Sequence, residues 1–269
     1  MHNFPRITVV TPSFNQAKYL EQTILSVLNQ NYPNLEYIII DGGSTDGSKD
    51  IIEQYAEHIS FSLSEPDRGQ TEAINKGLVK ATGEWIAWQN SDDIYYPGVF
   101  RELAETAALY PEVGLIIGDM MLIDEHNKPL RCLRYTKPDY NAMRAEGMLI
   151  ANQAAFWHRD LQQKCGLLDE SFNYSFDYEW FLRLTRNTKG HHVSKIWGAL
   201  RIHEETKSNK KSQLFYEENC RILFGREIPA WQKPWFKLRR FILMLSQGQF
   251  KYIFRGILRR TLRFKGSRY

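Results

Sequence analysis

Cysteine is scarce in this chain of 269 residues: Cys132, Cys165 and Cys220 stand far apart, and none belongs to a CxxC pair. This pattern excludes a disulfide scaffold or a zinc ribbon and favours a reducing cytoplasm. Residues 1–6 run directly into a strand pattern, which predicts that there is no signal peptide. Apolar runs are short as well, because the longest candidate, 241–245, has five residues and a membrane-spanning helix needs about 20. We therefore expect a cytoplasmic protein.

Two nucleotide-binding signatures are also missing. Neither GxGxxG nor GxxxxGK[ST] occurs, so a dinucleotide-binding fold and a P-loop ATPase are not supported. Acidic residues are missing from the C-terminal part, where residues 228–269 hold eleven Lys or Arg and no Asp or Glu. The preceding 227 residues hold 24 basic and 31 acidic side chains, a net charge of −7 (24 − 31). This contrast predicts a mildly acidic domain over 1–225 and a basic tail over 226–269.

Strand-like and helix-like patterns alternate in the first 120 residues. The expected strands are 6–11, 35–40, 59–63, 85–88 and 114–117, and the expected helices are 18–29, 50–58, 71–81 and 97–109. Beyond them we expect a hairpin-like excursion over 120–134, strands over 153–157 and 192–197, and helices over 176–187 and 213–223. Such alternation predicts an α/β fold with a mainly parallel central sheet flanked by helices on both faces.

Polar clusters follow three of the expected strands, at 11–16, 41–48 and 89–93. Right-handed crossovers put the carboxyl ends of parallel strands on one edge of the sheet. Ligands of open α/β sheets bind just beyond that edge. The three clusters are therefore expected to meet at one ligand site.

Adjacent carboxylates, Asp92 and Asp93, follow the strand expected over 85–88. Two carboxylates are costly to hold together unless a cation neutralises them. Hard oxygen ligands suit Mg²⁺ or Mn²⁺, and such ions often complete their coordination with substrate phosphates. The alternative is that one of the two acids caps a turn before Pro97.

The segment 41–48 reads Asp-Gly-Gly-Ser-Thr-Asp-Gly-Ser. Its paired glycines allow the backbone to pass close to a ligand, and Asp41 can accept hydrogen bonds from a ribose or a base. Ser44 or Asp46 can also cap the following helix. We expect both uses, with Asp46 structural and Asp41 functional.

Further candidates are weaker when taken alone. Arg68 can pair with a phosphate or form a surface ion pair. Asp177 and Glu179 lie at the amino end of an expected helix, where capping also explains carboxylates. His203 is a lone histidine, and such residues are more often structural than ligands.

Together these motifs resemble family 2 of the nucleotide-sugar glycosyltransferases, which have the GT-A fold. The resemblance covers roughly residues 5–208. It rests on motifs in the family's order and spacing: Thr11-Pro-Ser-Phe-Asn15, Asp41-Gly-Gly-Ser-Thr-Asp-Gly-Ser48, Glu65-Pro-Asp-Arg-Gly-Gln70, Asn75-Lys-Gly77 and Asn90-Ser-Asp-Asp93.

The resemblance implies a role for each matching residue. Contacts with the nucleotide-sugar are expected from Thr11, Pro12, Ser13, Asn15, Asp41, Gly43, Asp67, Arg68, Gln70 and Asp92. Asp93 would bind the Mn²⁺ or Mg²⁺ that bridges the diphosphate, and His203 resembles a late histidine found near it. Asp177 matches the general base, in a segment often written Glu-Asp-x-Asp. Because Phe176 replaces the Glu and Glu179 the second Asp, Glu179 is a second candidate and Asp177 the favoured one.

The function implied by the resemblance is inverting, metal-dependent transfer of one sugar. The donor would be a nucleoside-diphosphate sugar, with UDP the expected nucleotide, and the acceptor a glycan or lipid-linked hydroxyl in cell-surface polysaccharide or glycolipid synthesis. Residues 119–151 are expected to govern the choice of acceptor. A nucleotide-sugar binding protein without catalysis and a nucleotidyltransferase are the alternatives. The sequence does not indicate the oligomeric state.

The basic tail shows helical spacing over 231–245 and 250–262, with apolar faces and cationic flanks. Such helices resemble interfacial membrane helices, and each Lys or Arg near an anionic leaflet contributes about 1 kcal/mol. We predict docking at the inner face of the cell membrane. The alternative is packing on the catalytic domain or on a second subunit. Nucleic acid is not the expected partner, because no nucleic-acid motif accompanies the charge.

Overall fold

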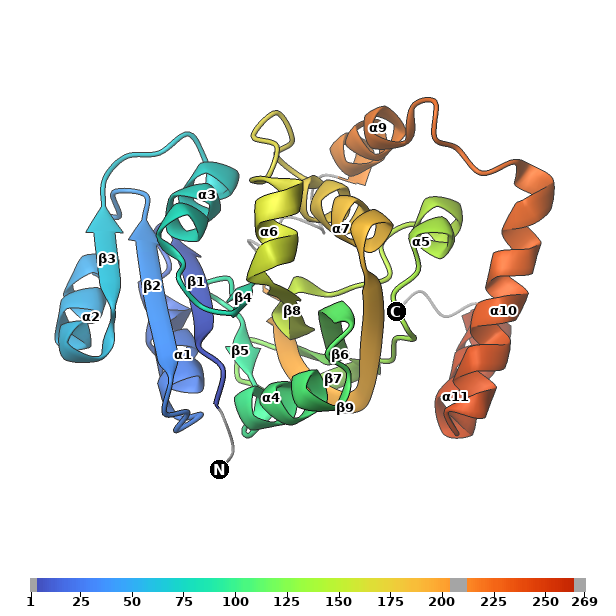
Figure 1. Ribbon diagram of the computed structural model, residues 1–269, viewed down its shortest axis with the longest axis horizontal. Helices are drawn as coiled ribbons and strands as arrows, with labels where there is room; N and C mark the ends of the chain where they lie inside the picture. Colours follow the sequence, from blue (N-terminus) through green and yellow to red (C-terminus); the bar gives the residue numbers. More distant parts are fainter. Residues whose placement is uncertain (1–3, 204–211, 264–269) are drawn as a thin grey trace.

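The computed structural model describes residues 4–203 and 212–263. Its centre is a sheet in the order β3-β2-β1-β4-β8-β6-β9-β5, with β7 paired to β6 (Figure 1). The strands are β1 (Ile7–Ser13), β2 (Leu35–Asp41), β3 (Phe61–Ser64), β4 (Trp85–Trp88), β5 (Ile94–Tyr95), β6 (Val113–Ile123), β7 (Pro129–Leu133), β8 (Ala155–His158) and β9 (Lys189–Arg201). The larger helices of the sheet domain are α1 (Ala17–Leu28), α2 (Ser48–Gln54), α3 (Gln70–Lys80), α4 (Val99–Leu109), α5 (Tyr140–Glu146), α6 (Arg159–Cys165), α7 (Phe176–Asn187) and α9 (Ser212–Leu223).

The predicted α/β class is confirmed, and the parallel arrangement holds for one half of the sheet. β3, β2, β1 and β4 are all parallel. In the other half β8 is antiparallel to both β4 and β6, while β6 and β9 are parallel. The expected excursion over 120–134 is the antiparallel β6–β7 hairpin. The sheet is therefore mixed beyond β4.

Two hydrophobic layers cover the sheet, because successive side chains of a strand point to opposite faces. On one face α3, α5, α6, α7 and α9 pack on strand residues such as Val10, Ile40 and Trp88. On the other face α1, α2 and α4 pack on residues such as Ile7 and Val9. Burial on both faces explains the continuous apolar runs of the parallel strands.

One helix begins later than expected. The pattern predicts a helix from Pro97, but α4 begins at Val99, after Gly98 with a φ of 86°. Gly98 tolerates this left-handed conformation because it has no side chain, and Pro97 therefore lies outside the helix.

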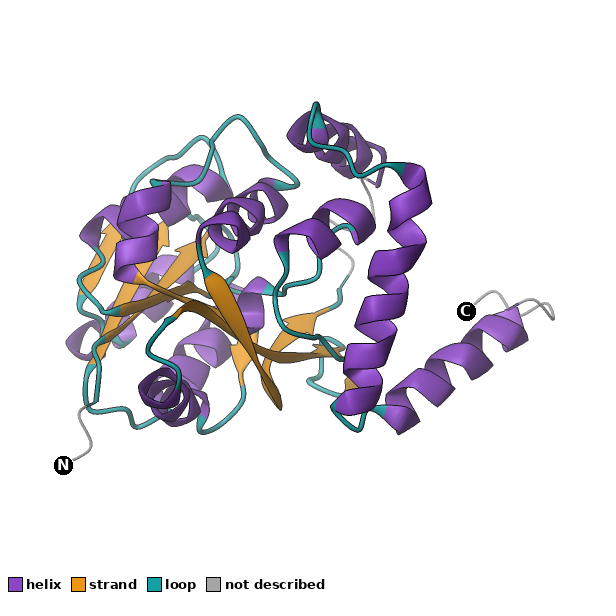
Figure 2. Cartoon of the chain, turned by 45° about the vertical axis from the view of Figure 1, so that its right-hand side comes forward, coloured by secondary structure: helices purple, strands orange, loops and turns teal. Residues whose placement is uncertain are grey.

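The C-terminal helices extend the sheet domain at its side. Ile222 of α9 belongs to the hydrophobic core, and the Glu218 carboxylate accepts hydrogen bonds from the backbone N–H groups of residues 173–175. α10 (Lys233–Ser246) then packs against α5. α11 (Phe250–Arg263) turns away from the sheet domain (Figure 2). Across the described residues, no helix combines the length and apolar character needed to cross a bilayer.

Candidate functional site

A cavity of about 680 Å³ lies beyond the carboxyl ends of β1 and β4. Its walls combine the loops that follow those strands with the segments that lead into α5, β8 and α7. The lining residues include Pro12, Ser13, Gly42, Asp67, Arg68, Gln70, Asn90, Asp92, Tyr135, Met148, Ile150, Asn152, Gln153, Asp177 and His203. The expected convergence of the strand ends on one site is thus realised.

The loops after β1 and β2 are locked together by hydrogen bonds. Asn15 has a φ of 50°; its N–H donates to Ser44 Oγ at 2.8 Å, and its Oδ1 accepts from the Thr45 N–H at 2.9 Å. Asparagine tolerates this left-handed conformation better than most residues. Asn15 therefore shapes the cavity rim and does not line the cavity itself.

Asp41 organises the loop after β2 from within the protein. Its side chain is fully buried, and its carboxylate accepts hydrogen bonds from the Gly43 and Ser44 N–H groups at 3.1 and 2.9 Å. The hydroxyls of Ser44 and Ser64 donate to it as well. These four donors already satisfy the carboxylate, and Asp41 does not line the cavity. Contact between Asp41 and a nucleotide therefore stays a prediction.

Asp46 ties the same loop to α1. Its Oδ2 accepts from the Ala17 N–H at 2.9 Å, and its Oδ1 accepts from Ser48. Burial alone would raise the pKa of Asp46, but these hydrogen bonds outweigh it and hold that pKa below its usual value. The structure thus gives Asp46 the expected structural place.

Close approaches constrain positions 42 and 43, and the backbone conformation of Gly43 favours glycine there. A side chain on Gly42 would place Cβ 2.7 Å from the Asp67 carboxylate. Gly43 has a φ of 83° and lies against the Pro66 backbone. Asp67 reaches the cavity over this bare backbone, and burial raises the pKa of its carboxyl.

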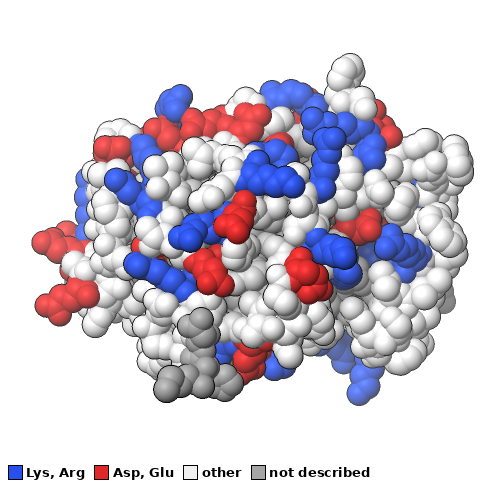
Figure 3. All heavy atoms as spheres, viewed as in Figure 1, with Lys and Arg blue, Asp and Glu red and all other residues white. Residues whose placement is uncertain are grey.

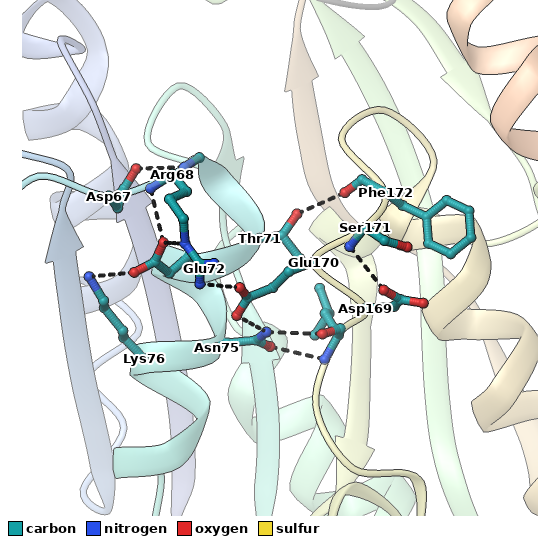
Figure 4. Close-up of polar contacts among 12 residues, drawn as sticks. Asp67, Arg68, Thr71, Glu72, Asn75, Lys76, Asp169, Glu170, Ser171 and Phe172 are labelled. Atoms are coloured by element: carbon teal, nitrogen blue, oxygen red, sulfur yellow. Dashed lines mark hydrogen bonds and ion pairs between the residues drawn. The ribbon is translucent and has the colours of Figure 1, made fainter.

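Arg68 is held in an ion-pair network at the start of α3 (Figure 4). Its guanidinium contacts Glu72 at 2.7 Å and Glu170 at 2.6 Å. Asn75 donates to both the Glu170 side chain and the Leu168 carbonyl, which joins α3 to the 167–172 loop. Arg68 thus forms the surface ion pair and also lines the cavity, so its pairing with a phosphate stays a prediction.

Asp93 lies beneath the cavity floor and is fully buried. Its carboxylate accepts from the Arg201 N–H at 2.9 Å, from Gln153 Nε2 at 2.7 Å and from Asn90 Nδ2 at 3.0 Å. Burial raises the pKa of Asp93, and the nearby Asp92 raises it further, against these three donors. The structure does not bring the Asp93 side chain to the cavity surface, where the predicted metal role would require it.

Asp92 faces the cavity together with His203. The two side chains are joined by a 3.0 Å hydrogen bond between His203 Nε2 and Asp92 Oδ2. Arg201, two residues before His203 on the chain, is buried; its Nε donates to the Asp92 carbonyl at 2.8 Å and its guanidinium lies over the Tyr19 ring. Arg201 therefore fixes the backbone that presents Asp92.

Asp177 lines the cavity at the first turn of α7. Burial raises the pKa of its carboxyl to about 6; hydrogen bonds from the N–H groups of Asp177 and Tyr178 oppose the rise and Glu218 adds to it. A carboxylate with such a pKa is a stronger proton acceptor than an exposed aspartate and is still ionised near neutral pH.

Glu179 points elsewhere. Its carboxylate pairs with Arg183 at 2.7 Å, and Arg183 also donates to the carbonyls of Cys165 and Leu167. Glu179 does not line the cavity. The structure thus separates the two acids, with Asp177 at the cavity and Glu179 in an ion pair with Arg183 on the next turn of α7.

The remaining predicted residues divide into two groups. Pro12, Ser13 and Gln70 line the cavity, and Gln70 Nε2 donates to Asn90 Oδ1 at 2.8 Å. Thr11 is fully buried and its hydroxyl lies 3.1 Å from that of Tyr37. Thr11 therefore holds strands together and has no place in the cavity wall.

Sequence reasoning overlooked two residues, Gln153 and Arg201. Both are needed to hold Asp93 and Asp92, yet Gln153 is 60 and Arg201 108 positions away from Asp93. One signal was available for Arg201: it lies two residues from His203, a spacing that puts alternate strand residues on one face.

Comparison with known proteins adds independent findings. The sequence model of glycosyl transferase family 2 matches residues 8–149, which is just over half of the chain. A glycosyltransferase of Rickettsia prowazekii is 28% identical over 212 residues, covering 76% of this chain and 66% of that protein. A glycosyltransferase of Rickettsia felis is 27% identical over 82% of this chain, but the match covers 38% of that protein. The chain thus spans between about a third and two thirds of these relatives.

Solved structures show the same fold at low identity. TarS of Staphylococcus aureus, crystallised in complex with UDP-GlcNAc, superposes with a TM-score of 0.65 at 18% identity, covering 90% of this chain and 73% of that one. The mannosyltransferase PcManGT of Pyrobaculum calidifontis, in complex with GDP-Man and Mn²⁺, gives a TM-score of 0.63 at 18% identity, covering 89% and 70%. These likenesses confirm a GT-A type arrangement.

Proposed function

We propose, from the premise that the chain belongs to glycosyl transferase family 2, that it transfers one sugar from a nucleoside-diphosphate sugar to an acceptor hydroxyl with inversion. The observation that carries the proposal is the placement of Asp177 in the same cavity as Asp92 and His203. Such a transfer requires a base and a diphosphate-binding group; in this proposal Asp177 is the base, and Asp92 and His203 form the diphosphate-binding group.

Two unpaired polar atoms support a polar ligand in the cavity. Among the described residues, Ser13 Oγ and Asn152 Nδ2 are buried without a hydrogen-bond partner, and both residues line the cavity. Buried polar atoms are nearly always paired, so an unpaired one in a cavity points to a ligand or water. A nucleotide-sugar carries enough hydroxyls and phosphate oxygens to satisfy both.

Asp92 and His203 are the proposed holders of Mn²⁺ or Mg²⁺, in place of the predicted pair Asp93 and His203. Within the described residues, no three His, Cys, Asp or Glu side chains gather in a metal cluster. Two protein ligands still fit such an ion, because it is commonly held by one or two side chains and completes its coordination with water and substrate phosphates. When bound, the ion would neutralise negative charge on the departing diphosphate.

Asp177 acts as the general base in this scheme. Its carboxylate accepts the proton of the acceptor hydroxyl while the hydroxyl oxygen attacks the anomeric carbon. The bond between that carbon and the diphosphate oxygen breaks in the same displacement, and the nucleoside diphosphate leaves. One displacement inverts the anomeric configuration.

The acceptor side of the cavity is apolar. Tyr135, Met148 and Ile150 line it, and all three belong to the stretch 119–151 expected to govern acceptor choice. We propose a UDP-sugar as donor, which the complex of TarS with UDP-GlcNAc supports. A lipid-linked or glycan acceptor of cell-surface polysaccharide or glycolipid synthesis fits the apolar wall.

Product analysis tests the proposed reaction. The purified chain is incubated with a UDP-sugar, Mn²⁺ and a lipid extract as the source of acceptor, and the released nucleotide is identified. Release of UDP that is lost in Asp177→Asn and retained in Glu179→Gln supports transfer with Asp177 as base. Release of pyrophosphate, or equal UDP release by wild type and Asp177→Asn, contradicts it.

A further inference from the structure

The helices at the C-terminal end expose an unusually large set of apolar side chains. Trp231 is 78% exposed and Trp235 62%, although tryptophan is highly buried on average. Further exposed side chains follow on both helices: Leu238, Phe241, Ile242, Phe250, Phe254 and Leu258. We call these eight residues the apolar face. Clusters of large exposed apolar side chains are uncommon on a soluble domain and point to an interaction site.

The opposite side of α10 already holds the helix to the sheet domain. Arg239 pairs with Asp139 at 3.0 Å, and Arg240 pairs at 2.7 Å with Glu146, whose side chain is 4% exposed. Met244 is buried on the same side. The apolar face cannot turn inward without breaking these contacts, so it does not serve to pack α10 on its own domain.

The charge around the apolar face selects the partner. Residues 228–269 contain eleven Lys or Arg and no acid, and Lys233, Lys237, Lys251 and Arg255 are exposed on the two helices. A second copy of the chain docked through the same helices would bring two basic surfaces together, which is unfavourable. An anionic bilayer offers hydrocarbon for the apolar face and negative headgroups for the cations. In Figure 3 the right-hand margin, over α10, is mostly uncharged surface.

The tail is also tied to the wall of the cavity. α10 packs on α5, and the chain after α5 carries Met148 and Ile150 into the cavity wall. At the turn between α10 and α11, Gln249 Nε2 donates to the carbonyl of Tyr135 at 3.2 Å, and Tyr135 lines the cavity. An external surface that α10 and α11 contact would therefore lie beside the apolar side of the cavity.

We propose that α10 and α11 dock the protein on an anionic lipid bilayer, with the apolar face at the headgroup boundary, and so present the cavity to a lipid-linked acceptor. The statement about the acceptor rests on the proposed function, whereas the docking does not. Tryptophan suits such a boundary because its ring is apolar and its N–H is polar.

Vesicle co-sedimentation of the full chain tests the contribution of the apolar face. The vesicles contain phosphatidylcholine with phosphatidylglycerol, and a second set contains phosphatidylcholine alone. We expect sedimentation with the anionic set and its loss in the double variant Trp231→Ser, Trp235→Ser. The matched control is Val79→Ser, Leu109→Ser, which removes two exposed apolar side chains elsewhere and should sediment like wild type.

The charge contribution is tested on the same vesicles. Removing one cation near an anionic surface lowers the partition coefficient about fivefold, the equivalent of about 1 kcal/mol. Lys251→Gln, Arg255→Gln should therefore lower it about 25-fold by the same estimate. Lys49→Gln, Lys189→Gln removes two exposed cations of the sheet domain and should leave it unchanged.

Three results would overturn the docking proposal. The first is the absence of sedimentation with anionic vesicles, and the second is equal sedimentation of wild type and both tail variants. The third is a dimer in sedimentation equilibrium that the tryptophan variant abolishes, while vesicles bind neither protein. Thermal stabilisation by UDP-sugar and Mn²⁺, measured in every variant, separates the two proposals. Vesicle binding without donor stabilisation contradicts the proposed function alone, and donor stabilisation without vesicle binding contradicts docking alone.

Discussion

At the residue scale, the raised pKa of Asp177 couples the proposed base to the stability of the fold. Burial raises this pKa to about 6 from an ordinary 3.8. Between those two pH values the unfolded chain ionises Asp177 while the folded chain keeps it protonated, so stability falls as pH rises from about 4 to about 6. Above pH 6 the ionised carboxylate costs the folded state at most about 3 kcal/mol.

Asp177→Asn should therefore inactivate the protein and stabilise it. We expect its advantage in unfolding free energy over wild type to grow from pH 4 to pH 6 and then to stay constant. In wild type, transfer should rise with pH and level off above about 6, because the base must be ionised. Denaturant titrations from pH 4 to pH 8 measure the first effect; a constant or negative difference would show that Asp177 is not strained by burial.

Asp92 and Asp93 are neighbours with different predicted effects. Asp92→Asn changes a side chain that faces the cavity, so we expect a large loss of Mn²⁺-dependent UDP affinity with an unchanged melting temperature. Asp93→Ala leaves Gln153, Asn90 and the Arg201 N–H without their acceptor, and each unsatisfied buried group costs about 1–3 kcal/mol. Asp93→Ala should therefore melt lower.

Calorimetric titration of UDP with Mn²⁺, beside melting curves, distinguishes these effects. The contradicting result is that Asp92→Asn binds UDP like wild type while a folded Asp93 variant loses the Mn²⁺ dependence of UDP binding. That result would show that Asp93 binds the metal, as the sequence predicts.

At the element scale, the sequence predicts that the strand ends meet at one site. It does not predict which distant residues form hydrogen bonds with the side chains there. The alternation of strands and helices placed 11–16, 41–48 and 89–93 at one edge, because parallel strands with right-handed crossovers leave no other arrangement. The choice between Asp92 and Asp93 depended instead on Gln153 and on Arg201 of β9, which approach from distant parts of the chain. Adjacent sequence positions do not show which carboxylate such partners will cover.

The mixed half of the sheet was harder to predict for a related reason. β8 enters between β4 and β6, and a strand of four residues does not encode its neighbours. β9 continues to Arg201, beyond the expected end at Trp197, because residues 198–201 pair with residues 120–123 of β6. That extension carries Arg201 and His203 to the cavity.

The crossing of β9 over the 152–154 turn gives a prediction at this scale. A side chain at Gly198 would collide with the Gln153 backbone, and overpacking of this kind costs about 1–3 kcal/mol. Gly198→Ala should lower the melting temperature and, by displacing Gln153 from Asp93, weaken UDP binding. Gly256→Ala on α11 meets no neighbouring atom within 4 Å and serves as the control. If Gly198→Ala is as stable as wild type, the 152–154 turn can shift to accommodate the added side chain at no cost in stability.

At the scale of the whole molecule, the cavity joins two differently built halves. The parallel half contributes Ser13 at the end of β1 and Asp67 in the loop after β3, and the mixed half contributes Tyr135, Met148 and Asp177. This division fits a donor bound by the loops after β1–β4 and an acceptor bound by the apolar side. The tail continues that apolar side outward through α5 and α10.

The central claim is that this cavity binds a nucleotide-sugar with the help of a divalent ion. A thermal-shift screen of UDP-, GDP- and dTDP-sugars, each with and without Mn²⁺, tests it most directly. A ligand that binds only the folded state stabilises it by about 2.7 kcal/mol when its concentration is a hundred times its dissociation constant. This stabilisation raises the melting temperature. We predict a rise with a UDP-sugar that requires Mn²⁺ and disappears in Asp92→Asn. A melting temperature unchanged by every donor, with and without Mn²⁺, would contradict the account.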